Sequence, residues 1–272
     1  RCAIRAAICL GCDIQELSRF DRKNYFYPDL PKGYQISQFY HPYALGGSIP
    51  FTRDDGSAAV LPLVRIHMEE DAGKSSHEED GTSRIDLNRC SSPLLEIVSE
   101  PLLMSGTEAA SCVRSVRALL RWVGVCDGDM EKGNLRCDVN VSVMPEDAVE
   151  LGTRAELKNL NSFVSIERSV VVETARQIDV IEGGGQVVQE TRLWDQDKEV
   201  TASMRGKEDS PDYRYFPEPD LPVVWITEDD IQQQSGNLPE MPEDRRQRWL
   251  NEYDFPEREV VPLLSRRENG DY

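Results

Sequence analysis

Long apolar runs are missing from this sequence. No stretch approaches the ~20 consecutive apolar residues that a membrane-spanning helix needs, so we expect no membrane-spanning segment and no membrane partner. Cysteines are few: seven are scattered through 272 residues, and this odd number excludes a disulfide framework and favours a reducing compartment. Hydrophobic residues still make up 39% of the chain, which is enough for an ordinary folded core.

Acidic residues clearly outnumber basic ones. The chain has 31 Lys and Arg against 49 Asp and Glu, which gives a formal net charge of −18. A field of this sign repels phosphate backbones. We therefore exclude a general nucleic-acid binder, expect no DNA partner, and expect any RNA contact to be local.

Two familiar site signatures are incomplete. Cys9 and Cys12 have the spacing of a zinc-binding pair, but no second pair of Cys or His follows at zinc-site spacing. Gly73-Lys74-Ser75 ends like a phosphate-binding loop, but Met68 occupies the position of the first glycine. Neither motif predicts a site. The chain begins with Arg, and we expect its native N-terminus to lie outside this sequence.

Two helices are predicted with clear ends. Residues 106–123 carry an apolar stripe at helical spacing, and Ser105 with Glu108 forms a capping box at its start. A second helix is predicted over 163–182, with Ser162 as its N-cap and glycines directly after it.

Strands are predicted over 60–71, 135–143, 153–158 and 186–194. In the first of these, alternation predicts two faces: Val64, Ile66, Met68 and Glu70 on one, and Arg65, His67 and Glu69 on the other. The order of strands and helices shows no regular βαβ alternation. It favours an α+β fold with a largely antiparallel sheet and packed helices.

Four acids stand where an isolated charge would be costly. Glu96 interrupts the apolar run Leu94–Val98, where we expect it to be buried. Glu70, Asp138 and Glu156 lie on predicted strands, the last two beside basic and amide side chains. Carboxylates from several strands suit a hard divalent cation such as Mg²⁺.

Salt bridges to neighbouring Arg or Lys explain each acid equally well, so both interpretations stay open on this pattern alone. His67 and His77 are the types of residue that bind metals, but a single strand histidine is more often only hydrogen-bonded. A row of arginines on the first helix is more typical of a solvated face than of an RNA contact; it consists of Arg114, Arg117 and Arg121.

Eight longer motifs then follow one another in a familiar order. They are FDRKNYFYPDLPKGYQISQ (20–38), HMEEDAGKSSH (67–77), DLNR (86–89), PLLEIVSEP (93–101), LRCDVNVSV (135–143), ELKNLNSF (156–163), QETRLWD (189–195) and DYRYFPEPDLP (212–222). Together they resemble the B subunit of the aspartyl/glutamyl-tRNA amidotransferases, and the resemblance covers the whole chain.

The resemblance implies a kinase-like transamidation. In that family the B subunit recognises mischarged Glu-tRNA(Gln) or Asp-tRNA(Asn) and uses ATP with Mg²⁺ to phosphorylate the side-chain carboxylate. Ammonia from the glutaminase (A) subunit then displaces phosphate, and a small C subunit completes the complex. The family acts in the bacterial cytoplasm or in a mitochondrial or plastid matrix.

The same resemblance implies a catalytic cradle over residues 1–235, with its N-terminal part missing, and the beginning of a helical domain over 236–272. It suggests metal ligands, catalytic residues and contacts to ATP or the tRNA acceptor end. The metal ligands are Glu70, Glu96 and Asp138; the catalytic residues are Arg136, Glu156 and Lys158; the remaining contacts are Asn159, Asn161, Arg205 and Arg214.

Family members also carry an acid and a histidine near their N-terminus for the same metal, and this chain lacks that segment. Two other interpretations predict different behaviour. A non-catalytic scaffold or RNA-binding subunit of the same fold would not bind MgATP specifically. An unrelated metal-dependent hydrolase would turn over without ATP.

Overall fold

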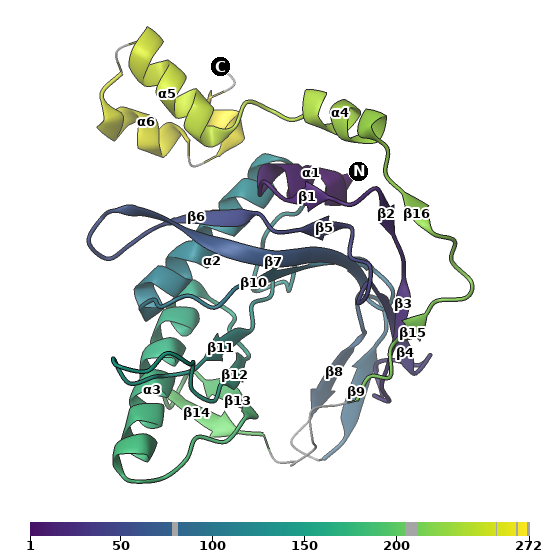
Figure 1. The fold of residues 1–272 in the computed structure, drawn as a ribbon, viewed down its shortest axis with the longest axis vertical. Coiled ribbons are helices and arrows are strands. Elements are labelled where there is room, and N and C mark those ends of the chain that lie inside the picture. Colours follow the sequence, from purple (N-terminus) through teal and green to yellow (C-terminus); the bar gives the residue numbers. More distant parts are fainter. Residues whose placement is uncertain (78–80, 205–211, 254, 265, 271–272) are drawn as a thin grey trace. The chain divides into compact units, whose positions relative to one another are not determined.

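The computed structural model describes residues 1–77, 81–204, 212–253, 255–264 and 266–270. Helices and mostly antiparallel sheets make up these residues, which confirms the predicted α+β class (Figure 1). The chain forms two compact units. Unit 1 holds the described parts of 1–48, 62–100 and 208–241, and unit 2 holds those of 49–61, 101–207 and 242–272. The predicted boundary after residue 235 stays a prediction.

Unit 1 is built from short strands, as the Tyr-, Pro- and Gly-rich early sequence requires. Its helices are α1 (Cys2–Cys9) and α4 (Glu228–Gly236), and its strands are β1 (Asp13–Ile14), β2 (Leu17–Ser18), β3 (Asp21–Asn24), β4 (Tyr34–Ser37), β5 (Ala44–Leu45), β8 (Lys74–His77), β9 (Ser83–Asp86), β10 (Pro93–Ser99), β15 (Phe216–Pro217) and β16 (Val224–Trp225). Two further strands, β6 (Ser48–Thr52) and β7 (Ala58–Glu70), each have some residues in unit 1 and some in unit 2.

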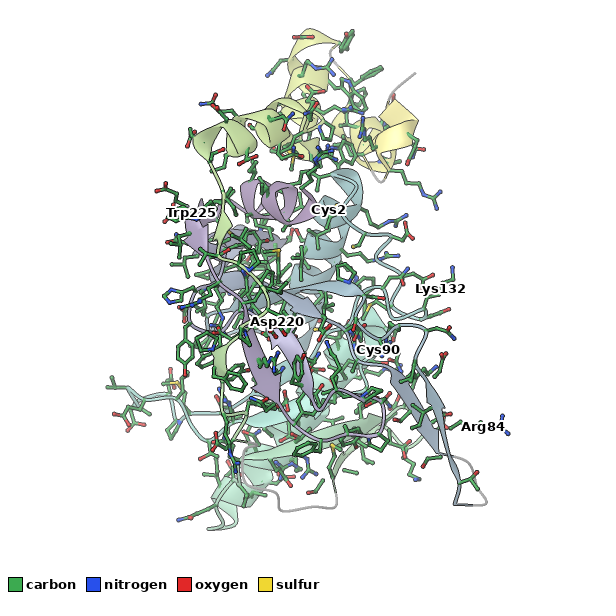
Figure 2. All side chains as sticks on the ribbon, turned by 90° about the vertical axis from the view of Figure 1, so that its right-hand side faces the viewer. Cys2, Arg84, Cys90, Lys132, Asp220 and Trp225 are labelled. Atoms are coloured by element: carbon green, nitrogen blue, oxygen red, sulfur yellow. The ribbon has the colours of Figure 1, made fainter. Side chains whose placement is uncertain are left out.

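The sheets of unit 1 have the orders β1-β5-β7-β10, β15-β3-β4, β16-β2 and β8-β9, and all of these pairings are antiparallel. The β8-β9 hairpin is a two-stranded ribbon that carries Arg84 (Figure 2). The longest strand, β7, pairs with β5 on one side and with β10 on the other.

A bulge interrupts the alternation of β7. The β7–β10 register shifts between Val98 and Ser99, and the shift skips Val64. Leu63 and Ile66 are both buried, whereas Val64 is exposed. The prediction that Val64 shares a face with Ile66 is therefore wrong, because an extra residue in a bulge changes which face the following side chains take. From Ile66 onward the predicted alternation holds, and His67 lies opposite Glu96 on β10.

Unit 2 is a four-stranded sheet covered on one face by helices. Its sheet has the order β11 (Val139–Val141), β12 (Ala155–Lys158), β13 (Glu190–Asp195) and β14 (Val200–Ser203), and its helices are α2 (Gly106–Trp122), α3 (Phe163–Glu182), α5 (Pro242–Glu252), α6 (Glu257–Leu263) and the 3-10 helix η1 (Arg267–Gly270). β12 and β13 run parallel and are joined by α3, whereas the other pairs are antiparallel.

Both predicted helix starts are confirmed. Ser105 and Glu108 form the full capping box of α2, and Ser162 caps α3 by accepting the backbone N–H of Ser165. The strand predicted over 135–143 is shorter than expected, since only residues 139–141 find backbone partners on β12.

The core of unit 2 lies between this sheet and the two long helices. Its buried members are Ala109, Ala110, Val141, Leu157, Leu160, Ile166, Val170 and Trp194. The alternate side chains of the same strands point to the opposite face of the sheet. Among the described residues, no helix is both long and apolar enough to cross a membrane.

Candidate functional site

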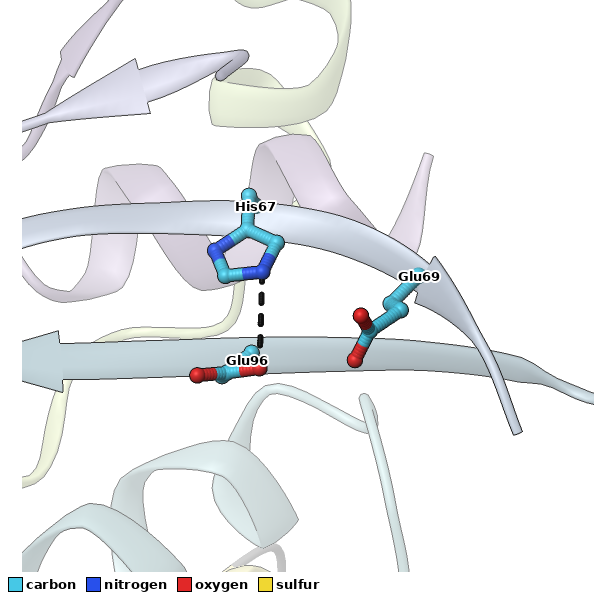
Figure 3. A group of neighbouring side chains, drawn as sticks. All are labelled: His67, Glu69 and Glu96. Carbon is cyan, nitrogen blue, oxygen red and sulfur yellow. Dashed lines mark ion pairs between the residues drawn. The ribbon is translucent and has the colours of Figure 1, made fainter. Parts of the chain in front are cut away.

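Two neighbouring strands of unit 1 bring together three residues that could bind a metal ion. His67 and Glu69 lie two residues apart on β7, and Glu96 projects from β10 toward them (Figure 3). One ligand atom from each residue lies within 4.8 Å of those of the other two. His67 Nε2 is 3.4 Å from Glu96 Oε2. We call His67, Glu69 and Glu96 the acidic cluster.

The acidic cluster is partly open to solvent. His67 and Glu69 are buried, but 48% of the Glu96 side chain is exposed. The prediction that Glu96 is buried is wrong, because β10 stands at the edge of its sheet and none of its residues is fully buried. A hydrogen bond from His67 lowers the pKa of Glu96 to about 2, with further lowering by the positive charges of Lys23 and Arg65. Glu96 is therefore ionised at neutral pH.

A lysine already neutralises part of this charge. Lys23 Nζ lies 3.2 Å from Glu69 Oε1 and 5.1 Å from the centre of the Tyr213 ring. Burial acts to lower the pKa of Lys23, but Glu69, Glu96 and two tyrosines together outweigh it, and the pKa is raised overall. Lys23 is thus a fixed ammonium beside the acidic cluster.

Glu70, the acid that the family motif assigned to a metal, points away from the acidic cluster. It is buried, forms an ion pair with Lys32, and accepts the backbone N–H of Ile36 at 2.9 Å. Its metal role stays a prediction. Sequence reasoning left out Glu69, although the alternation of the strand already placed Glu69 on the same face as His67.

The donors of the acidic cluster suit a divalent cation. Two carboxylates are typical ligands of Mg²⁺ or Mn²⁺, and an imidazole adds a nitrogen donor that Mn²⁺ accepts more readily than Mg²⁺. His67 Nδ1 is buried and has no hydrogen-bond partner in the described part of the chain. Since ligating histidines usually donate their second N–H, Glu69 and Glu96 are the better-supported ligands.

A second charged group lies on the open face of the unit 2 sheet. Lys158 Nζ lies 2.5 Å from Asp138 Oδ2 and 3.3 Å from Glu156 Oε1, and Thr191 donates to Glu156 at 2.9 Å. Burial acts to lower the pKa of Lys158, but the two carboxylates raise it overall. The sequence left open whether these acids form salt bridges or bind a metal ion. For Asp138 and Glu156 the salt bridge is present. One ammonium between two carboxylates leaves the group net negative, so a phosphate group would need a further cation beside it.

The turn between β12 and α3 carries both predicted asparagines. Asn159 has a positive φ of 68°, a conformation that asparagine tolerates well, and its amide donates to the carbonyl of Trp194 at 3.0 Å. Asn161 donates to Asn159 Oδ1 at 3.1 Å. The two side chains therefore form one hydrogen-bonded turn, next to Lys158 at the end of β12 and just before the N-terminus of α3.

The three predicted arginines belong to different parts of the chain. Arg136 is exposed on the irregular segment before β11, and Arg214 pairs with Asp212 at 3.5 Å on the surface of unit 1. Arg205 lies outside the described residues.

In the row of arginines on α2, two guanidinium groups pack on an aromatic ring rather than pointing freely into solvent. Arg114 and Arg117 lie 5.1 and 5.7 Å from the centre of Phe163. This contact supports a structural role for both.

Comparison with known proteins agrees with the motifs. The GatB/GatE catalytic domain matches residues 1–232. The B subunit of the aspartyl/glutamyl-tRNA(Asn/Gln) amidotransferase of Thioalkalivibrio sulfidiphilus is 49% identical over 273 residues, covering 100% of this chain and 57% of that protein. The proteins of the same name from Chlorobaculum tepidum and Halorhodospira halophila are each 50% identical, covering 99% and 100% of the chain and 57% of each relative. The chain thus spans somewhat more than half the length of these relatives, and it belongs to the GatB/GatE family.

Proposed function

We propose that this chain is part of the kinase-like subunit of a tRNA-dependent amidotransferase. Its substrate is the side-chain carboxylate of Glu or Asp on a mischarged tRNA, which is phosphorylated by ATP and then amidated by ammonia to give Gln-tRNA(Gln) or Asn-tRNA(Asn). One observation carries the proposal: the chain is 49–50% identical to amidotransferase B subunits, and it brings together two carboxylates and a histidine that could hold a cation.

The chemistry explains why such a site is needed. A carboxylate resists attack by ammonia, because its oxygen is a poor leaving group, and an acyl phosphate supplies a good one. A bound divalent cation would offset the negative charge of the phosphoryl group during transfer. In this chain Glu69 and Glu96 would hold the cation, with His67 beside them. Lys23 would keep the remaining charge of the acidic cluster low.

The Lys158 ammonium of unit 2 is a second charged group that the proposal uses. Lys158 stays protonated between Asp138 and Glu156, so it acts through its charge and not as a base. A metal ion on Asp138 would offset the excess negative charge of this group, and the Lys158 ammonium would then suit the phosphates of ATP. Roles for Arg136, Asn159, Asn161, Arg205 and Arg214 in binding ATP or the acceptor end belong to the proposal, as does a metal role for Glu70 and Asp138.

The proposal also names partners. Ammonia requires a glutaminase (A) subunit, and the family complex includes a small C subunit. The relatives carry the name of a B subunit, in agreement with a complex of several different chains. The site of action would be the compartment that holds the mischarged tRNA, either the bacterial cytoplasm or an organelle matrix.

The test uses a full-length protein carrying this sequence, assembled with its A and C subunits. Glu-tRNA(Gln), MgATP and glutamine are supplied, and Gln-tRNA formation is followed for the wild type, Glu96→Gln and Glu100→Gln. Glu100 is a matched control, since it is exposed and directly follows β10. We expect ATP-dependent product in the wild type and in Glu100→Gln, and at least a hundredfold loss in Glu96→Gln because one cation ligand is removed.

Product in all three proteins would leave the amidotransferase function standing and remove Glu96 from the site. A wild-type complex that binds tRNA but forms no product would favour the scaffold. Turnover without ATP would favour the hydrolase.

A further inference from the structure

Helix α3 of unit 2 exposes an apolar stripe. Val164, Val171 and Ile178 are spaced seven residues apart, and their exposed fractions are 53%, 58% and 40%. Ala175 lies between the last two and is also exposed. At 100° per residue these four side chains fall within about 60° of one another on the helix, the geometry of a seam that packs against another helix. We call these four residues the α3 stripe.

The α3 stripe is not the side of the helix that forms the core. The core side is a different set of residues, all buried: Ser165, Ile166, Ser169, Val170, Glu173 and Gln177. An exposed helix face normally carries charged or polar side chains. Val171 lies beside Gly106 of α2, but Val164, Val171 and Ile178 all remain exposed, so the fold of unit 2 does not bury them.

A pocket adjoins one end of the helix. Ile181, which is 42% exposed, lines a hollow of about 240 Å³ together with Val143 and Val187. The exposed apolar side chains of α3 thus continue to Ile181, at the edge of a small hollow whose lining is both polar and apolar.

Charges beside the α3 stripe argue for a protein occupant and against RNA. Glu167, Asp179 and Glu182 border it on the same helix. The one basic residue on this face, Arg168, forms an ion pair with Glu199. An acidic border repels phosphates but complements a helix with Lys or Arg beside its apolar seam.

We infer that the α3 stripe is a docking surface for an amphipathic helix with basic flanks, contributed by another chain of the amidotransferase. The inference rests on the proposed function for the existence of that complex, and the relatives are themselves B subunits. The contact is a helix laid along an apolar seam, with Ile178 and Ile181 nearest the pocket.

The experiment places a photo-crosslinking amino acid at position 171 of the full-length protein, purified within the assembled complex. Position 149 serves as the control, because Val149 belongs to the same unit, is 97% exposed and lies off α3. We expect a crosslink from position 171 to the A or C subunit, identified by mass spectrometry. Position 149 should give a much lower yield of the same crosslink. In parallel, Val171→Glu with Ile178→Glu should weaken assembly at least tenfold, whereas Val149→Glu should change it less than twofold.

A crosslink from position 171 to tRNA, or to another part of the same chain, would overturn the inference. So would normal assembly of the double variant with native circular dichroism. If the wild-type complex assembles but makes no Gln-tRNA or Asn-tRNA, the proposed function is wrong. The crosslink would still show whether another subunit docks on the α3 stripe.

Discussion

Two lysines form ion pairs with the two adjacent glutamates at the end of β7. Lys23 neutralises Glu69 and Lys32 neutralises Glu70, one on each face of the strand. Such pairs offset much of the cost of placing carboxylates in a largely buried position. Glu69 nevertheless remains close enough to Glu96 for both to bind one cation, so Lys23 and the proposed metal ion would compete for the charge of Glu69.

We predict that Lys23→Met binds Mn²⁺ more tightly than the wild type. Two unit charges ~4 Å apart interact by about 1 kcal/mol in water and about 4 kcal/mol near a protein surface. Removing the repulsion between Lys23 and the bound Mn²⁺ should therefore raise the affinity about tenfold. Titration of the full-length protein with Mn²⁺ by electron paramagnetic resonance measures this directly. Lys132→Met is the control, since Lys132 pairs only with its neighbour Asp129 on the surface of unit 2. Weaker binding in Lys23→Met would mean that Lys23 holds the acidic cluster in shape instead of competing for it.

At the scale of elements, Glu173 ties α3 to the β13–β14 hairpin. It is fully buried and accepts hydrogen bonds from Arg176 at 2.6 Å, Gln177 at 2.8 Å and Thr201 at 2.8 Å. It also pairs with Arg192 at 3.3 Å. These contacts fix the helix whose N-terminus follows the Asn159–Asn161 turn, although none of them involves the site itself.

We predict that Glu173→Gln lowers the free energy of unfolding by about 3 kcal/mol, because two arginines lose their buried counter-charge. Urea unfolding followed by circular dichroism measures the change. Glu182→Gln, at an exposed position of the same helix, should change the free energy by less than about 0.5 kcal/mol. An equal loss in both variants would show that helix charge, not the buried contacts, is responsible.

The same residue gives a pH dependence with a defined sign. Burial acts to raise the pKa of Glu173, but its hydrogen bonds from Arg176, Gln177 and Thr201 outweigh burial and lower the pKa below the ordinary 4.5. A lowered folded-state pKa stabilises the protein fully above the unfolded value, and this stabilisation is lost as the pH falls through the folded value. The stability difference between wild type and Glu173→Gln should therefore be constant above about pH 5 and should shrink below about 4.5.

At the scale of the whole chain, the net charge of −18 limits how RNA can be held. Of the basic row on α2, Arg114 and Arg117 pack on Phe163. On the proposed function, we predict that any tRNA binding by this chain depends only weakly on salt, with about two or three phosphate contacts. Its affinity should then fall about 15-fold between roughly 50 and 200 mM salt. Fluorescence anisotropy with labelled tRNA tests this; a fall of more than about a thousandfold would show that a basic surface dominates despite the net charge.

Much of this molecule follows from local sequence. The starts of α2 and α3 were predictable, because Ser105 with Glu108 and Ser162 satisfy the free N–H groups of a first turn within a few residues. The α+β class followed from the order of the periodic segments. The family followed from eight ordered motifs, whose residue types reflect a shared chemistry.

Only the tertiary structure decided which acids come together. The bulge at Val64 and the edge position of β10 are set by strand pairing, so the exposure of Glu96 could not be read from its apolar neighbours. Strand pairing also placed Glu70 where it pairs with Lys32 and accepts the backbone N–H of Ile36, and it brought Glu69 beside Glu96. The sequence by itself determined the residue types, the helix ends and the family. The fold decided which carboxylates share a face, because contacts between distant strands depend on register, which local patterns do not encode.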